Sequence, residues 1–168
     1  MRDDIPIAEL RDLLDYDSKS GVLRWKPRKS NRQFNFRFSG KCAGRISKLG
    51  YRQVRINGIL YSAHRVCWAI HFGSWPVGMI DHVNGDKSDN SVSNLRECDK
   101  SLNGANRGVQ ANNKIGVKGV CWRAGKWQCT VVKNGAYFYK GRFNTIEEAS
   151  AAYAEHAKIA FGDFARVA

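Results

Sequence analysis

The sequence predicts an α+β fold built from small modules, and three observations support this prediction. Apolar residues recur at helical spacing near both ends of the chain, over 5–16 and 146–161. Asn-Gly pairs lie between short apolar runs at 57–58 and 134–135, where they are typical of β-hairpin turns. A chain of 168 residues is also short for two large domains, so two or three small modules fit it better.

The first predicted element is a helix over residues 5–16. Its apolar residues fall on one face, namely Ile7, Leu10, Leu13 and Leu14. Turn residues follow at 17–21, and the run Val22-Leu23-Arg24-Trp25 is typical of a strand. The N-terminal region is therefore expected to be small and rich in β-structure.

The stretch 18–80 contains no acidic residue. Within Lys26–Lys41, phenylalanines at 34, 36 and 38 alternate with polar residues, which favours a strand or a loop that orders on DNA. Basic residues with aromatic residues between them suit phosphate contacts and base stacking. A solvated basic loop whose Phe residues belong to the core is an equally good interpretation.

Residues 50–63 predict a hairpin around the turn Asn57-Gly58. A helix is expected to follow, from His64 through Phe72, with most of its apolar residues in the core. We interpret His64 and His71 as structural residues of this helix.

The segment 78–107 predicts a strand, a loop, a second strand and a helix. The first apolar run, 77–80, ends on the pair Asp81-His82, and a turn-rich loop leads to Asn94, which opens the second run, 95–98. Asp99 or Ser101 can cap the helix. Its polar residues are Asn103, Asn106 and Arg107.

These polar residue types suit metal-assisted cleavage of a phosphodiester. An imidazole such as that of His82 can act as general base for water. Asp81 and Asn103 offer hard oxygen ligands, which suit Mg²⁺ or Mn²⁺ better than zinc. Asp81 and His82 can serve one site only if their strand ends or bends there, because neighbouring strand residues point to opposite faces. Asn94 could bridge the loop and orient His82, although a purely solvated turn explains the same Asp and Asn residues.

Residues 116–168 predict three strands followed by a helix. The strands are expected at Val117–Trp122, Trp127–Lys133 and Ala136–Phe143. Thr145 and Glu148 predict a capping box, and the helix should end at Gly162. By strand alternation, Trp127, Cys129 and Val131 should face this helix.

Composition points to a polyanionic partner. The net charge is +13, from 28 Lys and Arg against 15 Asp and Glu, which favours nucleic acid first and a membrane surface second. The charge is concentrated in residues 1–63, with 14 basic and 6 acidic side chains, and in 114–168, with 9 and 4. A nuclease with separate DNA-binding arms on either side of a neutral catalytic module would have this distribution.

Several classes of protein are disfavoured. No run of about 18 apolar residues predicts a membrane span, and no signal-peptide pattern opens the chain. The five cysteines contain no CxxC pair, which argues against a zinc ribbon or a secreted disulfide framework. Reduced thiols and a cytoplasmic location are expected.

The segment 78–107 resembles the HNH nuclease family, whose catalytic unit is a ββα-metal (His-Me) finger. Asp81-His82 matches the first motif, Asn94 the central Asn, and Asn103 the position of the last His. Asn94 follows His82 by 12 residues, and Asn103 follows Asn94 by 9. These spacings resemble the homing endonucleases of phages and introns, which often have Asn at the last position. The upstream runs Ala63-His64-Arg65 and Gly73-Ser74-Trp75-Pro76 resemble the same branch. The resemblance implies that His82 activates water, that Asp81 and Asn103 hold one Mg²⁺ or Mn²⁺, and that Asn94 orients the site.

Residues 116–168 resemble the APETALA-type (ethylene-response-factor) DNA-binding domain. The matching runs are Gly119-Val120, Gly125-Lys126-Trp127, Gly141-Arg142-Phe143 and the Ala-rich helix ending at Phe161-Gly162. That family lays its three-stranded sheet in the major groove, so by alternation Gln128, Thr130, Val132, Tyr137 and Tyr139 should face DNA. Cys121 and Val132 stand where the family has Arg, so the plant target sequence does not carry over.

The predicted DNA contacts lie in the basic stretch, on the hairpin, after the nuclease module and on the C-terminal sheet. They are Arg28, Lys29, Arg32, Arg52, Arg55, Arg107, Trp122, Arg123, Lys126, Gln128, Thr130, Tyr137, Tyr139 and Arg142.

The sequence thus predicts a site-directed, metal-dependent DNA endonuclease of the homing type, encoded by a phage or mobile intron. The expected parts are a basic N-terminal region (1–63), the nuclease module (64–107), a linker (108–115) and the C-terminal DNA-binding domain (116–168). One finger per chain predicts that a monomer, with no oligomer required, nicks one strand of double-stranded DNA. The alternative is a non-catalytic, sequence-specific DNA-binding protein or regulator with a decayed nuclease finger, and an RNA-binding protein is a third interpretation.

Overall fold

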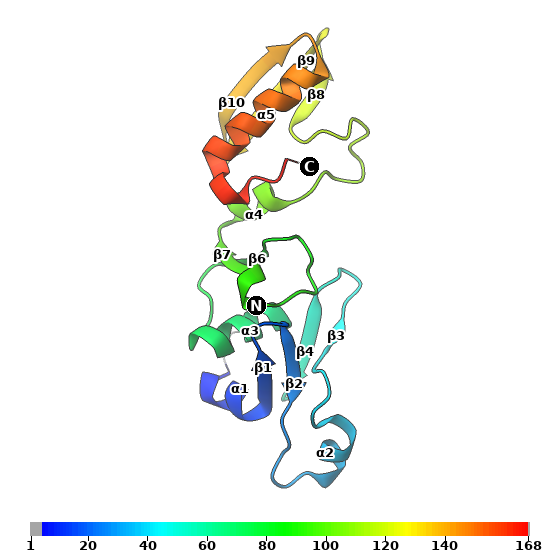
Figure 1. Cartoon of the computed structure of the whole chain (residues 1–168), viewed down its shortest axis with the longest axis vertical. Coiled ribbons are helices and arrows are strands. Elements are labelled where there is room, and N and C mark those ends of the chain that lie inside the picture. The colour runs from blue at the N-terminus through cyan, green and yellow to red at the C-terminus, as the bar shows by residue number, and fades with distance from the viewer. Residues whose placement is uncertain (1–4, 168) are drawn as a thin grey trace. The chain divides into compact units, whose positions relative to one another are not determined.

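The computed structural model describes residues 5–167 of the chain. Residues 1–4 and 168, which belong to the expected N- and C-terminal regions, lie outside the described part. The α+β prediction is confirmed: short helices and small sheets alternate along the chain (Figure 1). The chain divides into two compact units, Met1–Glu97 and Cys98–Ala168, each with its own hydrophobic core.

The first unit combines short helices with small β-sheets. Its helices are α1 (Ile7–Leu13), α2 (Arg32–Phe38) and α3 (Ala63–Phe72). The strands pair as β1 (Leu14–Asp17) with β2 (Val22–Trp25), as β3 (Arg45–Ile46) with β4 (Arg52–Ile56) and β5 (Ile59–Ser62), and as β6 (Met79–His82) with β7 (Leu95–Cys98). A short 3-10 helix, η1 (Val92–Asn94), leads into β7.

The core of the first unit joins the helices to these sheets. Leu10 of α1, Leu23 of β2 and Val66 of α3 are fully buried in it. Ile80 of β6 and Leu95 of β7 belong to the same core. The two strands of the expected nuclease module therefore share one core with the expected N-terminal region.

The predicted helix over 5–16 is too long. α1 ends at Leu13, and Leu14–Asp17 pairs antiparallel with β2. Leu14 is buried and Asp15 exposed, which is the alternation of a strand. Helical spacing could not separate the two elements, because Leu10, Leu13 and Leu14 bury their side chains in either conformation.

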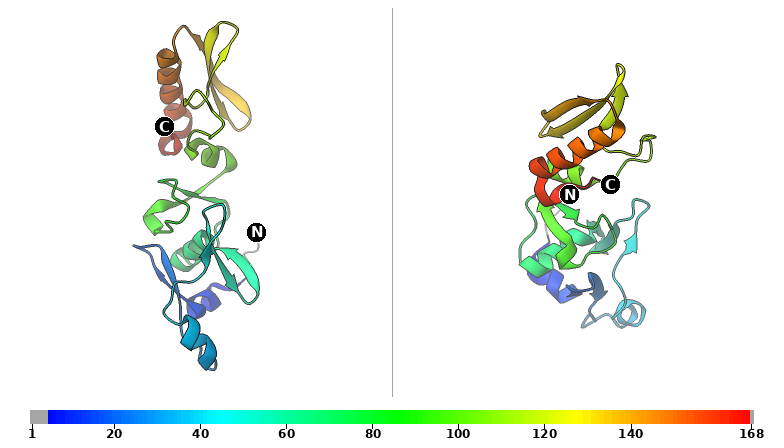
Figure 2. Two further views of the ribbon diagram at one scale, coloured as in Figure 1. Left: turned by 90° about the vertical axis from the view of Figure 1, so that its right-hand side faces the viewer. Right: turned by 45° about the horizontal axis from the view of Figure 1, so that its top comes forward.

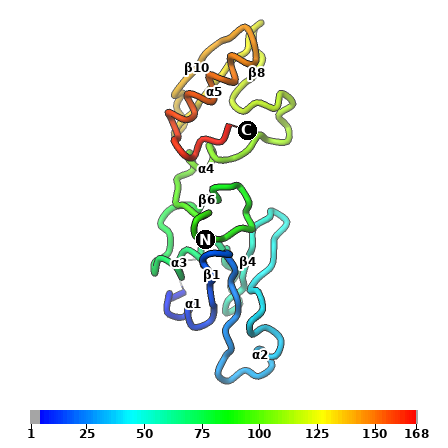
Figure 3. The backbone as a smooth tube through the Cα atoms, in the orientation of Figure 1, coloured from blue at the N-terminus to red at the C-terminus, as the bar shows by residue number. Residues whose placement is uncertain are grey.

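Residues 32–38 form a helix, so the expected strand or loop at the Phe residues is wrong. Asn31 caps α2, since its Oδ1 accepts a hydrogen bond from Phe34 N at 2.8 Å. The chain then returns to β2, where Trp25 N donates to Lys41 O at 3.0 Å, and Figure 3 shows this excursion. We call residues 26–41 the α2 lobe.

The second unit is a three-stranded sheet covered by one long helix. Its antiparallel strands are β8 (Val120–Arg123), β9 (Lys126–Lys133) and β10 (Ala136–Phe143), with β9 in the centre. α5 (Ile146–Phe161) lies along one face of the sheet, as Figures 1 and 2 show. The predicted capping box of Thr145 and Glu148 and the end at Gly162 are confirmed, and the 3-10 helix η2 (Gly162–Phe164) follows.

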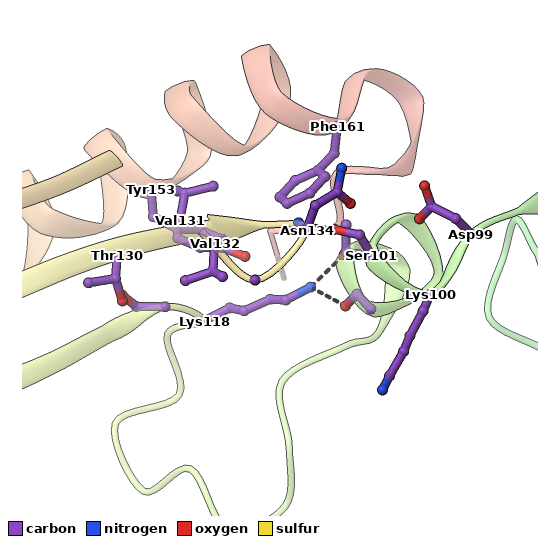
Figure 4. A pocket seen from close by; sticks show the side chains of 14 residues that line it. Asp99, Lys100, Ser101, Lys118, Thr130, Val131, Val132, Asn134, Tyr153 and Phe161 are labelled. Carbon is purple, nitrogen blue, oxygen red and sulfur yellow. Dashed lines mark hydrogen bonds between the residues drawn. The ribbon is translucent and has the colours of Figure 1, made fainter. Parts of the chain in front are cut away.

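A short helix before the sheet, α4 (Lys100–Asn106), also belongs to the second unit. Leu102 and Ala105 pack into its core. Lys118 Nζ donates hydrogen bonds to the backbone carbonyls of Gly104 and Ala105 near the end of α4 (Figure 4). It also donates to Arg107 O at 2.7 Å. Burial, and then the charges of Arg166 and Arg107, lower the pKa of Lys118 to about 8.

The packing therefore divides the chain at 97/98, inside the expected nuclease module. The expected boundaries at 63/64 and 107/108 fall within the two units. That these boundaries separate parts with different functions stays a prediction. The expected linker, 108–115, contains no helix or strand.

Two glycines before β8 allow a matched test of this packing. Gly119 and Gly116 have similar positive φ angles of 68° and 75°, but a Cβ on Gly119 would lie 2.2 Å from Tyr153 Cε2, whereas one on Gly116 would meet no atom within 4 Å. Gly119→Ala should cost roughly 2–5 kcal/mol of unfolding free energy, from backbone strain plus overpacking, and Gly116→Ala only about 1–2 kcal/mol. Hydrogen exchange of the β8–β10 amides measures the loss of unfolding free energy in each variant. Equal losses in the two variants would contradict the packing described.

Candidate active site

Asp81 and His82 are the last two residues of β6, and both are buried. Gly85 N donates to His82 O at 2.9 Å, so the chain turns directly after His82. The strand therefore ends where the Asp-His motif ends. This is the arrangement that allows the two neighbouring side chains to serve one site.

The ring of His82 is held by Asn90 in the loop that follows β6. Its Nε2 lies 3.1 Å from Asn90 Oδ1, and Asn90 is only 1% exposed. An N–H on Nε2 would donate to this amide oxygen, so the contact fixes the orientation of the ring. The ring also packs edge-on against His64, with the centroids 5.3 Å apart. Asn90 was not predicted, because an Asn in a turn-rich loop is usually a turn residue.

Asn94 bridges the two ends of the same loop. Its Oδ1 accepts a hydrogen bond from Asn84 N at 2.9 Å, and its Nδ2 donates to Asp89 O at 2.8 Å. Its backbone carbonyl accepts from Val83 N at 2.9 Å. Asn94 therefore sets the shape of the loop, and the direct contact with His82 comes from Asn90.

The acidic residues of the loop also build its turns. Asp86 Oδ1 accepts from Ser88 N at 2.9 Å, and Asp89 Oδ1 accepts from Ser91 N at 3.0 Å. These backbone N–H groups hold the pKa of both carboxyl groups below the usual range. The loop is thus an ordered hydrogen-bonded structure and not merely a solvated turn.

The loop is attached to the rest of the first unit on two sides. On one side Tyr16 Oη donates to Asn90 O at 2.7 Å, and Val92 N donates to Ser18 O at 2.9 Å. On the other side Lys87 Nζ donates to Leu49 O at 3.1 Å and lies 4.9 Å from the centre of the Tyr51 ring. The β1–β2 hairpin and the segment around 49–51 therefore hold the loop that holds His82.

Asp81 is paired with Arg96 on β7. Nη2 and Nε of Arg96 lie 2.9 Å and 3.0 Å from Asp81 Oδ2. Both side chains are largely buried, so the guanidinium balances the carboxylate in a site with little water. No sequence pattern pointed to Arg96, because its role depends on the pairing of β6 with β7.

Asn103, the second predicted metal ligand, lies on α4 in the second unit. Asp99 caps this helix, as predicted, by accepting from Leu102 N at 2.8 Å, and Arg107 follows the helix as its C-cap and is not part of it. Across residues 5–167 the structure shows no group of three or more His, Cys, Asp or Glu side chains that could hold a metal ion. The role of Asn103 as a ligand stays a prediction.

His64 on α3 lies beside His82 and is buried. Burial, and then the neighbouring charges of His82 and Arg65, lower the pKa of His64 to about 3. His64 is therefore neutral at physiological pH, in keeping with its interpretation as a structural residue. His71 lies near the end of α3 and is exposed.

Most of the predicted DNA contacts of the second unit share the sheet face that points away from α5. The strand register places them there as cross-strand neighbours. The exposed or half-exposed members are Arg123, Lys126, Thr130, Val132, Tyr137 and Arg142. Lys140, opposite Thr130, belongs to the same face although it was not predicted, and its Nζ lies 5.2 Å from the centre of the Tyr137 ring.

Three of the predicted contacts are placed differently. A β-bulge between Tyr137 and Tyr139 turns Tyr139 toward α5, where its ring stacks on His156 at 3.5 Å. Trp122 pairs with Trp127 and so shares the helix side of the sheet. Gln128 points away from α5 but is only 6% exposed, because the central strand places it between Cys121 and Arg142.

The predicted contacts of the first unit fall into two groups. Lys29, Arg32 and Arg55 are exposed, and Arg52 is half-buried. Arg28 instead packs its guanidinium 4.0 Å from the centre of the Phe34 ring. Alternation and charge did not predict this cation–π contact, because it depends on the helical conformation of α2.

Comparison with known proteins identifies the segment that contains this site. Residues 61–105 match the family model described as HNH endonuclease. No curated protein and no solved structure matches the chain. The match covers α3, β6, the loop, β7 and most of α4, and it supports a nuclease. Within residues 5–167, no helix combines the length and the apolar character needed to cross a membrane.

The attachment of the loop can be tested at Gly21 in the β1–β2 turn. A Cβ there would lie 2.3 Å from Ser91 N, whereas Gly40, with a similar φ angle (76° against 71°), has no atom within 4 Å of its Cβ position. Gly21→Ala should therefore push the loop away and speed hydrogen exchange across 83–94 by about tenfold or more. Gly40→Ala carries the same backbone strain and should leave exchange in that loop unchanged. Similar exchange in both variants would contradict the contact.

The burial of His64 predicts an acid-sensitive first unit. The pKa of His64 is 6.5 in the unfolded chain and about 3 in the folded one, so between these pH values only the unfolded chain binds the proton. The folded state therefore has its full stability above pH 6.5 and loses stability as the pH falls toward 3. The loss should reach about 3 kcal/mol near pH ~4. Urea unfolding at a series of pH values should show a flatter profile for His64→Leu than for the wild type. An identical slope in this window would exclude His64 as the source.

Proposed function

We propose that the chain is a metal-dependent, site-directed DNA endonuclease of the homing type. The observation that carries the proposal is the geometry of His82, at the end of β6, with Nε2 against Asn90 and the loop bridged by Asn94. This geometry falls within the segment that matches HNH endonucleases. A buried imidazole held in one orientation is what a general base requires.

In the proposed reaction, His82 removes a proton from a water molecule, and the resulting hydroxide attacks the phosphorus atom. The bond between phosphorus and the 3' oxygen breaks, and the leaving oxygen takes a proton from solvent, which leaves 5'-phosphate and 3'-hydroxyl ends. Asn94 acts by holding the loop, and Asn90 acts by holding the ring. A divalent ion, when bound, stabilises the charge that develops on the leaving oxygen.

Asp81 and Asn103 are the proposed ligands of one Mg²⁺ or Mn²⁺ ion. Asp81 supplies a buried carboxylate, which an ion would share with the guanidinium of Arg96, and Asn103 supplies a side-chain amide on α4. Mg²⁺ in nucleases and polymerases is usually bound by one or two carboxylates, with water and substrate phosphate completing its coordination. A donor set this small therefore fits Mg²⁺ better than it fits a structural metal such as zinc.

The remaining parts of the chain are proposed to bind duplex DNA. The basic face of β8–β10 would act as the APETALA-like anchor, and the arginines of the first unit would contact the backbone. One His82 per chain would cut one strand, so a monomer would nick. We place the activity in the cytoplasm of a bacterial host, with the chain encoded by a phage or intron.

A plasmid assay tests the catalytic role of His82. Wild type with Mg²⁺ or Mn²⁺ should convert supercoiled DNA carrying the target region to open circles, and EDTA should stop the reaction. His82→Ala should lower the rate at least about a hundredfold, because the general base is lost. Its binding to the same DNA should stay nearly unchanged.

His71→Ala is the matched control, because His71 is an exposed histidine on α3. It should cut like the wild type. Normal cutting by His82→Ala would overturn the assignment of the base. Tight binding without any cutting by the wild type, on the DNA that flanks its own gene, would favour a non-catalytic regulator instead.

A further inference from the structure

A cavity of about 480 Å³ lies in the first unit between the α2 lobe and the sheet β3–β4–β5. The register of the sheet places Arg45 opposite Gln53, and Arg55 opposite Leu60. Val54 and Ile56, which alternate with these residues on β4, are buried in the core. The sheet therefore turns its apolar face to the core and presents two arginines to the cavity.

The α2 lobe and the end of β2 provide aromatic walls on the other side. Phe34 and Phe38 of the lobe and Trp25 of β2 line the cavity. Trp25 and Phe34 meet edge-to-face at 5.6 Å, and Phe38 lies 5.1 Å from Phe34 and is 41% exposed. This places stacking surface directly opposite cationic side chains.

Arg28 completes the wall and is held in place by the lobe itself. Its backbone N and O bond to the side-chain amide of Asn35 at 2.7 Å and 2.8 Å, and its guanidinium lies on Phe34. Its Nε is buried and makes no hydrogen bond to the described residues. The wall is thus formed before any ligand arrives.

The charge around the cavity selects an anionic ligand. No acidic residue occurs anywhere in 18–80, and within residues 5–167 neither Arg45 nor Arg55 pairs with a carboxylate. Arg55 uses one of its donors on Gly58 O at 2.7 Å, which leaves others for a ligand. A ligand that combines a flat ring with a phosphate meets both requirements.

We propose that this cavity binds an unpaired nucleotide of DNA, with the base on the aromatic wall and the phosphate on Arg45 and Arg55. The inference rests on the proposed function, because it takes DNA as the ligand. Phosphates of an intact duplex need only an exposed basic surface, whereas a concave aromatic pocket can accept a base only after it has left the stack. The first unit would therefore prefer DNA that is distorted or contains an extra base.

Two phenylalanines of α2 give a matched pair for the test. Phe38 lines the cavity, whereas Phe36 is 87% exposed and does not. Binding is measured by fluorescence anisotropy in EDTA, which prevents cleavage, on a fully paired target duplex and on the same duplex with one extra thymidine. Thermal unfolding of both variants checks that they are folded.

The wild type and Phe36→Ala should bind the bulged duplex at least about fivefold more tightly than the paired one, and Phe38→Ala should lose this preference. Arg45→Gln should weaken binding to the bulged duplex in the same way. Equal binding of the two duplexes by the wild type, or a preference retained by Phe38→Ala, would overturn the inference and leave the nuclease proposal intact. Displacement by free thymidine monophosphate without any bulge preference would assign the cavity to a free nucleotide instead. Failure to bind any DNA would overturn the proposed function itself.

Discussion

The side-chain amide of Asn94 is the interaction on which the candidate site depends. One planar group accepts a hydrogen bond from Asn84 N and donates one to Asp89 O, so it joins the two ends of the loop. Within this closed loop, local turns at Asp86 and Asp89 order the backbone between its ends. Asn90 then reaches His82 because the closed loop places it there. An apolar residue at 94 would leave both backbone groups without this partner, which is costly at a buried position.

The same loop is supported by parts of the chain that are distant in sequence. Tyr16 and Ser18 hold it from the β1–β2 hairpin, and on the other side Lys87 of the loop donates to Leu49 O. A general base must keep its orientation within a fraction of an ångström to be effective. The N-terminal region therefore has a second task besides any DNA contact, which is to make the site rigid.

The residues that sequence analysis identified are those whose roles depend on local chemistry. The end of a strand at His82, the cap at Asp99, the capping box of Thr145 and the core positions Cys129 and Val131 all follow from local patterns. Asn90, Arg96 and the turned ring of Tyr139 depend on which strands pair and where a bulge lies, and no local pattern encodes these. The Phe residues at 34, 36 and 38 have a period of two, yet the cap at Asn31 and the closure of the lobe onto Trp25 favour a helix.

The packing of α4 limits how modular the chain can be. Helices of seven residues are not stable alone in water, so α4 must be stabilised by tertiary contacts. These come from the second core through Leu102 and Ala105, and from Lys118, which satisfies the carbonyls at the end of the helix. A chain cut in the expected linker would lose these contacts together with the sheet β8–β10. The helix that carries Asn103 would then unravel, so a role of Asn103 in metal binding would require the C-terminal domain even where that domain touched no DNA.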